Sequence, residues 1–121
     1  MANDISLQSE IDSIIELYSS GHIKEALNAA EALIIKHPNE SFLFNISGVC
    51  YKAIGQLRDA IKNFEKAISI KSDFTDAYYN LGLTFQELNM LEAAVKSYEK
   101  ALEFQPNYSL VYNNLGIVFK E

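Results

Sequence analysis

Apolar residues recur three and four positions apart along almost the whole chain, in seven segments separated by short polar breaks. This spacing places the apolar side chains of each segment on one face of an α-helix, which turns once in about 3.6 residues. The first two helices are predicted over about Leu7–Ser19 and Ile23–Lys36. Residues 1–5 carry no periodic pattern and are predicted to be frayed. The pattern therefore predicts an all-α fold of paired amphipathic helices.

The helix pair recurs with a fixed period. Glycines of the first helices and alanines of the second helices return every 34 residues (82 − 48 and 116 − 82; 60 − 26 and 94 − 60): Gly48, Gly82 and Gly116; Ala26, Ala60 and Ala94. The breaks within the pairs fall at Gly21, Gly55 and Asn89, residue types that tolerate the left-handed backbone of a helix C-terminus. One hairpin cannot bury its apolar faces alone, so the period predicts hairpins stacked into a solenoid.

The repeat resembles the tetratricopeptide repeat (TPR), a helical hairpin with an aromatic residue, Leu-Gly, an aromatic, Ala, an aromatic and Pro at fixed offsets. The third unit matches it with Tyr78, Leu81, Gly82, Phe85, Ala94, Tyr98 and Pro106. The second unit has Ser47 in place of the leucine and Ser72 in place of the proline. The first unit has Ile14 at the glycine position, lacks the aromatic residues and resembles a divergent capping repeat.

The resemblance implies a single domain over residues 1–121, folded as a right-handed α-α superhelix (TPR solenoid) of about 3.5 repeats. Its seven antiparallel helices would form repeats at approximately 7–40, 41–74 and 75–108, with a half repeat at 109–121. Within a hairpin, Gly48 is expected to face Ala60 and Gly82 to face Ala94, because small residues let two helices approach closely. The rings of Phe64 and Tyr98 are expected to fill the remaining volume.

The last segment supplies only the first helix of a fourth unit. Its apolar residues Leu115, Val118 and Phe119 are predicted to receive another helix. Repeat arrays normally shield their last core surface with a polar-faced helix. We therefore predict that the chain is a truncated fragment or that a second copy covers this end.

Composition narrows the classes of partner. The net charge is −6 and Arg58 is the only arginine, which argues against nucleic acid and anionic lipid as ligands. No apolar run approaches the roughly 18 residues of a transmembrane helix, and the acidic N-terminus is unlike a signal peptide. Cys50 is the only cysteine, so no intramolecular disulfide can form. We predict a cytoplasmic protein that is not membrane-bound.

No catalytic constellation is visible in the sequence. It has no phosphate-binding glycine loop, no nucleophile elbow and no histidine and cysteine pair at metal-ligand spacing. His22 and His37 are interpreted as surface residues beside helix ends, and Cys50 as a small structural side chain. The prediction is a protein that is not an enzyme and needs no cofactor or metal.

A binding surface remains. In TPR arrays the first helices line a concave groove, so the resemblance implies a protein or peptide partner in that groove. The corresponding positions are Phe42, Asn45, Val49, Lys52, Asp76, Tyr79, Asn80, Leu83, Gln86, Leu110, Asn113, Asn114 and Ile117. Phe42 and Tyr79 are predicted to be exposed aromatic anchors. The alternative for Val49, Leu83 and Ile117 is packing against neighbouring helices.

Two specialisations of the family fit less well. Chaperone-binding members hold a terminal carboxylate with basic groups, but Asp76 and Gln86 occupy such positions here. Members attached to a sugar transferase carry an asparagine ladder, which Asn80 and Asn114 match and Ile46 breaks. The predicted function is a non-enzymatic interaction scaffold. The alternatives are the recruiting segment of a larger enzyme such as a glycosyl- or other transferase, and a homo-oligomer formed through the C-terminal helix.

Overall fold

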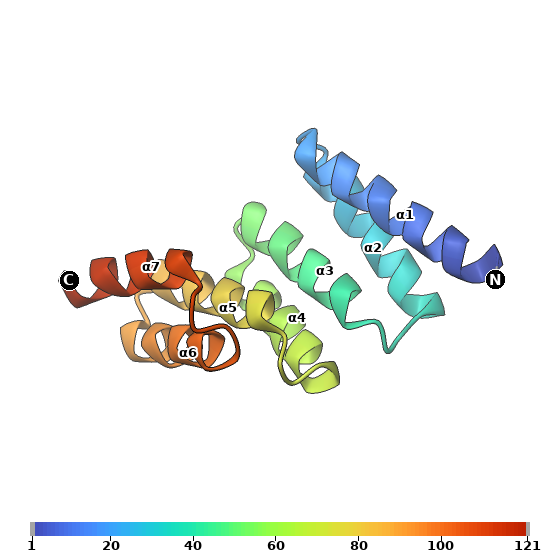
Figure 1. The fold of residues 1–121 in the computed structure, drawn as a ribbon. Coiled ribbons are helices and arrows are strands. Elements are labelled where there is room, and N and C mark those ends of the chain that lie inside the picture. Colours follow the sequence, from blue (N-terminus) through green and yellow to red (C-terminus); the bar gives the residue numbers. More distant parts are fainter. Residues whose placement is uncertain (1, 121) are drawn as a thin grey trace.

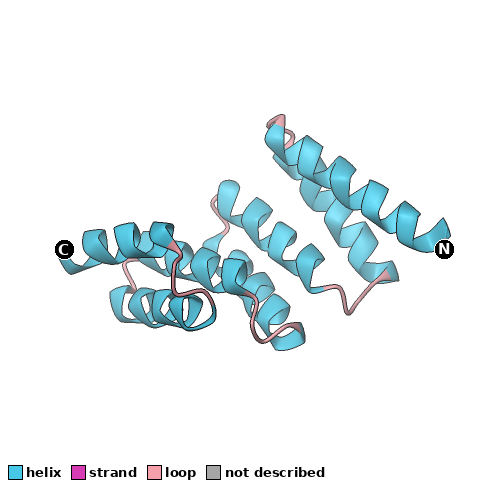
Figure 2. Ribbon diagram, viewed as in Figure 1, coloured by secondary structure: helices cyan, strands magenta, loops and turns pink. Residues whose placement is uncertain are grey.

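The computed structural model describes the backbone of residues 2–120 and the side chains from Leu7 to Lys120. The described chain forms seven α-helices and no strand (Figure 2). Their bounds are α1 Ala2–Ser19, α2 Ile23–Lys36, α3 Ser41–Ala53, α4 Leu57–Ile70, α5 Thr75–Glu87, α6 Leu91–Phe104 and α7 Ser109–Lys120. Helix α1 begins five residues before the predicted Leu7, so the predicted fraying is wrong for residues 2–5. Residue 1 lies outside the described part.

The helices stack as successive antiparallel hairpins, α1 with α2, α3 with α4 and α5 with α6, and α7 follows at the far end (Figure 1). The two termini lie at opposite ends of this array. Within the described chain, each odd-numbered helix contacts the next odd-numbered one, whereas no two even-numbered helices touch. The odd-numbered helices therefore form the inner side of the curve. The predicted all-α solenoid is confirmed.

The first helix of each hairpin ends in the same backbone motif. Gly21, Gly55 and Asn89 have φ of 87°, 84° and 59°, the left-handed conformation that their residue types predicted. In each case the next residue donates its N–H to a carbonyl five positions back, as Met90 does to Phe85 at 2.8 Å. This pattern is the Schellman motif, which satisfies carbonyl groups that the helix leaves free. The first helix therefore ends, and the second helix begins, at the same relative position in all three hairpins.

Close packing inside two hairpins depends on a glycine that receives an aromatic ring. A Cβ atom added at Gly48 would clash with the ring of Phe64, and one added at Gly82 would clash with the ring of Tyr98. The predicted partners of these glycines, Ala60 and Ala94, are fully buried, but the ring is what fills the space above each glycine. We call this arrangement, a ring seated on a helical glycine, the glycine socket.

The first hairpin is built differently. Ile14 occupies the position of the socket glycine and is itself buried, with 2% of its surface exposed. Its core also contains Leu27, Leu33 and Leu43, so aliphatic side chains replace the ring and the glycine.

Ser47, which replaces the repeat's leucine in α3, is fully buried, and its hydroxyl finds no hydrogen-bond partner in the described chain. A buried unpaired hydroxyl costs about 1–3 kcal/mol. The second unit's departure from the repeat is therefore a local loss of stability.

Candidate binding groove

The residues predicted to bind a partner lie on α3, α5 and α7. Some of their side chains contact another helix, and others are exposed to solvent. Those of α3 and α5 are mostly engaged in contacts between helices, and several of those on α7 are exposed. The two ends of the groove therefore differ from its middle.

Amide and hydroxyl groups connect successive inner helices. Asn80 donates its Nδ2 proton to Oδ1 of Asn45 on α3 at 3.1 Å. One repeat further on, Tyr79 donates its hydroxyl proton to Oδ1 of Asn114 on α7 at 3.3 Å. The two bonds join equivalent positions, since 45 and 80 become 79 and 114 when 34 is added. Asn45 is buried, with 7% exposed, so this amide bonds within the protein.

Tyr79 lies in an aromatic cluster instead of standing exposed as predicted. Its ring is half-buried, with its centroid 6.0 Å from that of Tyr98 and 5.2 Å from that of Tyr108. Aromatic pairs at these separations stabilise one another beyond their buried area. Tyr108 also donates its hydroxyl proton to Oδ1 of Asp76 at 3.2 Å. The cluster therefore joins α5, α6 and the loop before α7 into one unit.

Two further predicted residues are paired across helices. Gln86 accepts a hydrogen bond from the Tyr98 hydroxyl at 2.7 Å. The Lys52 amine lies 2.6 Å from a carboxylate oxygen of Glu87, which joins α3 to α5. Both polar side chains therefore already have partners within the protein.

Burial and acidic neighbours raise the pKa of several tyrosines. Desolvation, followed by the charge of Asp76, raises the pKa of Tyr108 to about 12. Desolvation also raises the pKa of Tyr98, which is fully buried. On the second hairpin the hydrogen bond to Glu31, 2.5 Å long, is the main reason why the pKa of Tyr51 is raised to about 12. All three hydroxyls are therefore neutral donors at physiological pH.

A region with a mixed apolar and polar lining lies between α1 and the start of α3. A pocket of about 350 Å³ opens there, lined by Leu7, Gln8, Ile11, Ile15, Glu40 and Phe42. Phe42 is half-buried, not fully exposed as predicted, and Ile15 is 42% exposed. The α1 residues that line this pocket were not among the predicted binding residues, because the first unit lacks the repeat motif. Subtracting the period from two predicted positions, Asn45 and Val49, would have found Ile11 and Ile15.

At the other end, Leu110 and Ile117 on α7 are 49% and 50% exposed, and Asn113 is exposed as well. Val49 packs partly against the core of the second hairpin, in line with the alternative considered for it, and Leu83 is half-buried. Ile117 is exposed and is not packed between helices, so the alternative does not apply to it. The exposed apolar groups of the groove thus lie at its two ends.

Cys50 lies in the core, and the two histidines lie beside helix ends. Cys50 is fully buried, and desolvation, with a smaller effect of Glu31, raises its pKa to about 11, so the thiol stays protonated at neutral pH. His22 is exposed at the start of α2, with Nδ1 3.3 Å from a carboxylate oxygen of Glu25, and His37 caps the end of the same helix. Both histidines lie beside helix ends, as predicted.

Two searches of the described residues are negative. No group of three or more histidine, cysteine, aspartate or glutamate side chains there could hold a metal ion. None of the described helices is both long and apolar enough to span a membrane.

Family models match the two units that carry the glycine sockets. The model described as "Tetratricopeptide repeat" matches residues 75–108, and the model described as "TPR repeat" matches residues 48–89. Together with the helical hairpins and their period, these matches show that the chain belongs to the tetratricopeptide repeat family. A comparison with curated protein sequences finds no significant match.

Solved structures share the fold at low sequence identity. The first TPR of Spaghetti (RPAP3), bound to the HSP90 peptide SRMEEVD, is 22% identical over 93% of this chain and 90% of that chain, with a TM-score of 0.89. The Yersinia enterocolitica type III secretion chaperone SycD, in complex with a peptide of the translocator YopD, is 20% identical over 96% and 95%, with a TM-score of 0.88.

A third similar structure is a mutant of the Thermobaculum terrenum O-GlcNAc transferase. It is 19% identical over 98% of this chain but only 23% of that chain, with a TM-score of 0.90. At these identities the three likenesses establish the solenoid fold and nothing finer.

Proposed function

We propose that this chain is a non-enzymatic scaffold that binds a segment of a partner protein in the groove formed by α1, α3, α5 and α7. The observation that carries the proposal is the pocket of about 350 Å³ between α1 and the start of α3, whose lining joins Ile11, Ile15 and Phe42 to the polar Gln8 and Glu40. Pockets lined by apolar side chains are where anchor residues of a partner contribute most binding energy. Two structures of the same fold, Spaghetti and SycD, were solved with peptides bound.

The chemistry of the groove favours an apolar anchor over a terminal carboxylate. Lys52 is paired with Glu87, and Asp76 places a negative charge on the same face. Ile15 and Phe42, by contrast, present apolar surface to a pocket large enough for one aliphatic or aromatic side chain. The partner would insert one such residue there and run along α5 towards Leu110 and Ile117 of α7.

The middle of the groove has a supporting role in this proposal. Asn80 uses one amide proton on Asn45 and keeps its carbonyl oxygen for a partner's backbone N–H. Because this amide is already oriented by its bond to Asn45, a ligand loses less entropy in ordering it. In this proposal, apolar residues at the two ends of the groove anchor the partner. The oriented amide groups between them bind the partner's backbone.

Selection of binders from a random peptide library on the immobilised protein tests the proposal. Selected peptides should share one large apolar residue, and Phe42→Ala and Ile15→Ala should each weaken their binding about tenfold, the effect of losing about 1.4 kcal/mol. Ile35→Ala is the matched control, because Ile35 is 82% exposed on the outer helix α2. Binders that lose affinity with Ile35→Ala and not with Phe42→Ala would contradict groove binding.

A further inference from the structure

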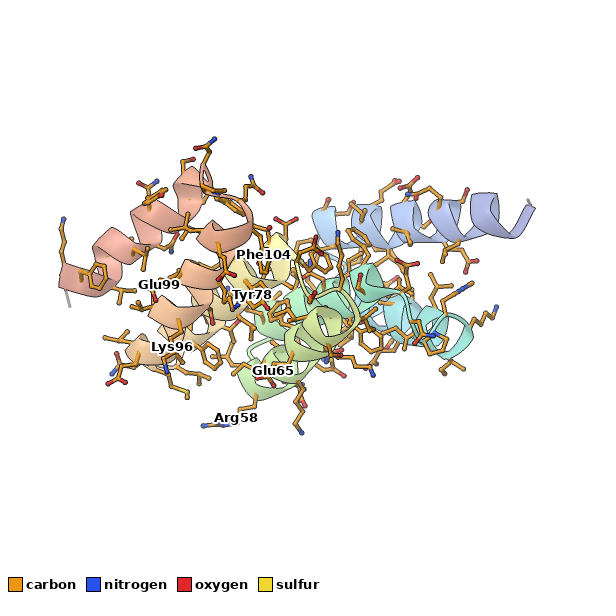
Figure 3. All side chains as sticks on the ribbon, turned by 60° about the horizontal axis from the view of Figure 1, so that its bottom comes forward. Arg58, Glu65, Tyr78, Lys96, Glu99 and Phe104 are labelled. Carbon is orange, nitrogen blue, oxygen red and sulfur yellow. The ribbon has the colours of Figure 1, made fainter. Side chains whose placement is uncertain are left out.

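Charge is distributed unevenly between the two sets of helices. The outer helices α2, α4 and α6 carry seven basic and seven acidic residues, whereas α1, α3, α5 and α7 carry two lysines and six acidic residues. Figure 3 shows both signs on the outer helices, with Arg58 and Glu65 labelled on α4 and Lys96 and Glu99 on α6. The net negative charge of the protein therefore comes from the inner helices and from the segments between helices.

One of the two inner lysines is already neutralised. The Lys52 amine lies 2.6 Å from a carboxylate oxygen of Glu87, and the other lysine, Lys120, is the last residue of α7. The sequences of α1, α3 and α5 contain no further lysine or arginine. These three helices therefore have no unpaired cation with which to bind an acidic ligand.

Glu40 is the carboxylate closest to the proposed anchor site. It lines the pocket between α1 and α3 together with Ile15 and Phe42. Although it directly precedes α3, it makes no side-chain capping hydrogen bond, and none of the ion pairs between described side chains includes it. The residue is half-buried, so water screens its charge less than that of an exposed carboxylate. A cation beside the pocket would therefore be attracted to it.

Asp76 is a second carboxylate at an equivalent groove position, one period of 34 residues after Phe42. It is exposed, and its Oδ1 accepts a hydrogen bond from the Tyr108 hydroxyl at 3.2 Å. That bond orients the carboxylate and uses only part of its capacity as an acceptor, since two oxygens offer about four lone-pair sites. None of the ion pairs between described side chains includes Asp76.

The spacing of the two positions sets the spacing expected in a ligand. Helices α3 and α5 contact each other directly, and the axes of packed helices lie about 8–10 Å apart. An extended chain advances about 3.3 Å per residue. A partner segment that crosses the inner helices in an extended conformation would therefore reach Asp76 about three residues from the residue held at Phe42.

We propose that the groove binds a basic segment of a partner protein, in which a large apolar residue has a lysine or arginine next to it and another about three positions away. The apolar residue enters the pocket at Phe42, the adjacent cation pairs with Glu40, and the second pairs with Asp76. This inference rests on the groove binding proposed above and specifies the chemistry of its partner. An acidic segment would bring like charge to both carboxylates, so the sign of the charge selects the partner.

Three labelled peptides test the charge of the partner on the intact chain. Each is an acetylated, amidated, fluorescein-labelled nonapeptide with phenylalanine at its centre, lysine one and three positions away on both sides, and serine elsewhere. In the second and third peptides glutamine or glutamate replaces the lysines. Fluorescence anisotropy should show saturable binding of the lysine peptide, binding of the glutamine peptide about tenfold weaker or worse, and none of the glutamate peptide. Absence of binding by the lysine peptide would overturn the proposal.

Glu40→Gln and Asp76→Asn remove the two charges from the protein and keep the shape of the side chains. Each should weaken binding of the lysine peptide about two- to fivefold, the effect of a partly exposed ion pair. Glu65→Gln is the matched control and should change nothing, because Glu65 is an exposed carboxylate on the outer helix α4. Equal weakening by Glu65→Gln and Glu40→Gln would overturn the proposal, since the peptide would then respond only to the net charge.

Phe42→Ala separates a failure of this inference from a failure of groove binding. If Phe42→Ala weakens binding of the lysine peptide and neither Glu40→Gln nor Asp76→Asn does, the basic partner is wrong and groove binding stands. Peptides from the random library that depend on Phe42 and carry no excess of lysine or arginine would have the same meaning. Binding of the lysine peptide that Phe42→Ala leaves unchanged would contradict both proposals.

Discussion

Gly82 and Gly116 occupy the same position one repeat apart, yet their surroundings are opposite. On α5 a Cβ at Gly82 would clash with the ring of Tyr98, whereas a Cβ at Gly116 on α7 would meet nothing described. The same residue type therefore has two energetic roles. Where a helix has docked, the glycine provides room for the ring. Where none has docked, it only weakens its own helix, since glycine is less favourable than alanine in a helix.

The largest effect is expected from emptying the filled socket. Tyr98→Ala removes a fully buried aromatic side chain and should lower the free energy of unfolding by about 3–5 kcal/mol. It would also remove the hydroxyl that bonds Gln86 and the ring that contacts Tyr79. Urea denaturation followed by circular dichroism measures the loss. A loss below about 1 kcal/mol, within the range of ordinary surface and small core changes, would show that the socket is not part of the core.

Filling the space beneath the ring should cost less. Gly82→Ala gains helix propensity of up to about 1 kcal/mol but overpacks the hairpin against Tyr98, at a cost of about 1–3 kcal/mol. We expect a net destabilisation in a thermal melt. Gly48→Ala is a second test of the same arrangement, because its Cβ would lie 2.5 Å from the ring of Phe64. A higher melting temperature for both variants would contradict the ring placement.

Alkaline pH should destabilise the tyrosine cluster that joins α5, α6 and the loop before α7. Folding raises the pKa of Tyr98 and of Tyr108, so between pH 10 and about 12 the folded state binds more protons than the unfolded state. The free energy of unfolding is therefore unaffected below pH 10 and falls as the pH rises through that range. Tyr98→Phe should reduce this slope. A slope equal to that of the unaltered protein would exclude Tyr98 as a contributor.

The sequence predicted the sockets only in part. The 34-residue period located the helices, the left-handed stops at Gly55 and Asn89 and the glycines themselves. It paired each glycine with an alanine, because a period shows which positions are equivalent and does not show which side chain reaches across. It placed Phe64 and Tyr98 inside the hairpins, but that the Tyr98 ring lies directly on Gly82 could be seen only once the rotation of α6 about its axis was known.

The contacts of the groove residues could also be predicted only in part from the sequence. Its backbone positions follow from the repeat, but the half-burial of Tyr79 depends on Tyr108 in the loop before α7. Asn45 is buried and accepts a hydrogen bond from Asn80 of the next repeat. Such contacts join residues on different repeats, and the motif of one repeat cannot describe them. The pocket at Ile15 was missed for a further reason, since the first unit keeps the period and loses the motif.

The smallest expected effect has the opposite sign. Gly116→Ala should raise the free energy of unfolding by about 0.5–1 kcal/mol, because alanine is the better helix former and its methyl group meets no described atom. Chemical denaturation in parallel with Gly82→Ala measures both, and opposite signs at equivalent positions are the result that the comparison requires. Destabilisation by Gly116→Ala would mean that in solution something already fills the socket on α7, so the contrast between the two glycines would be lost.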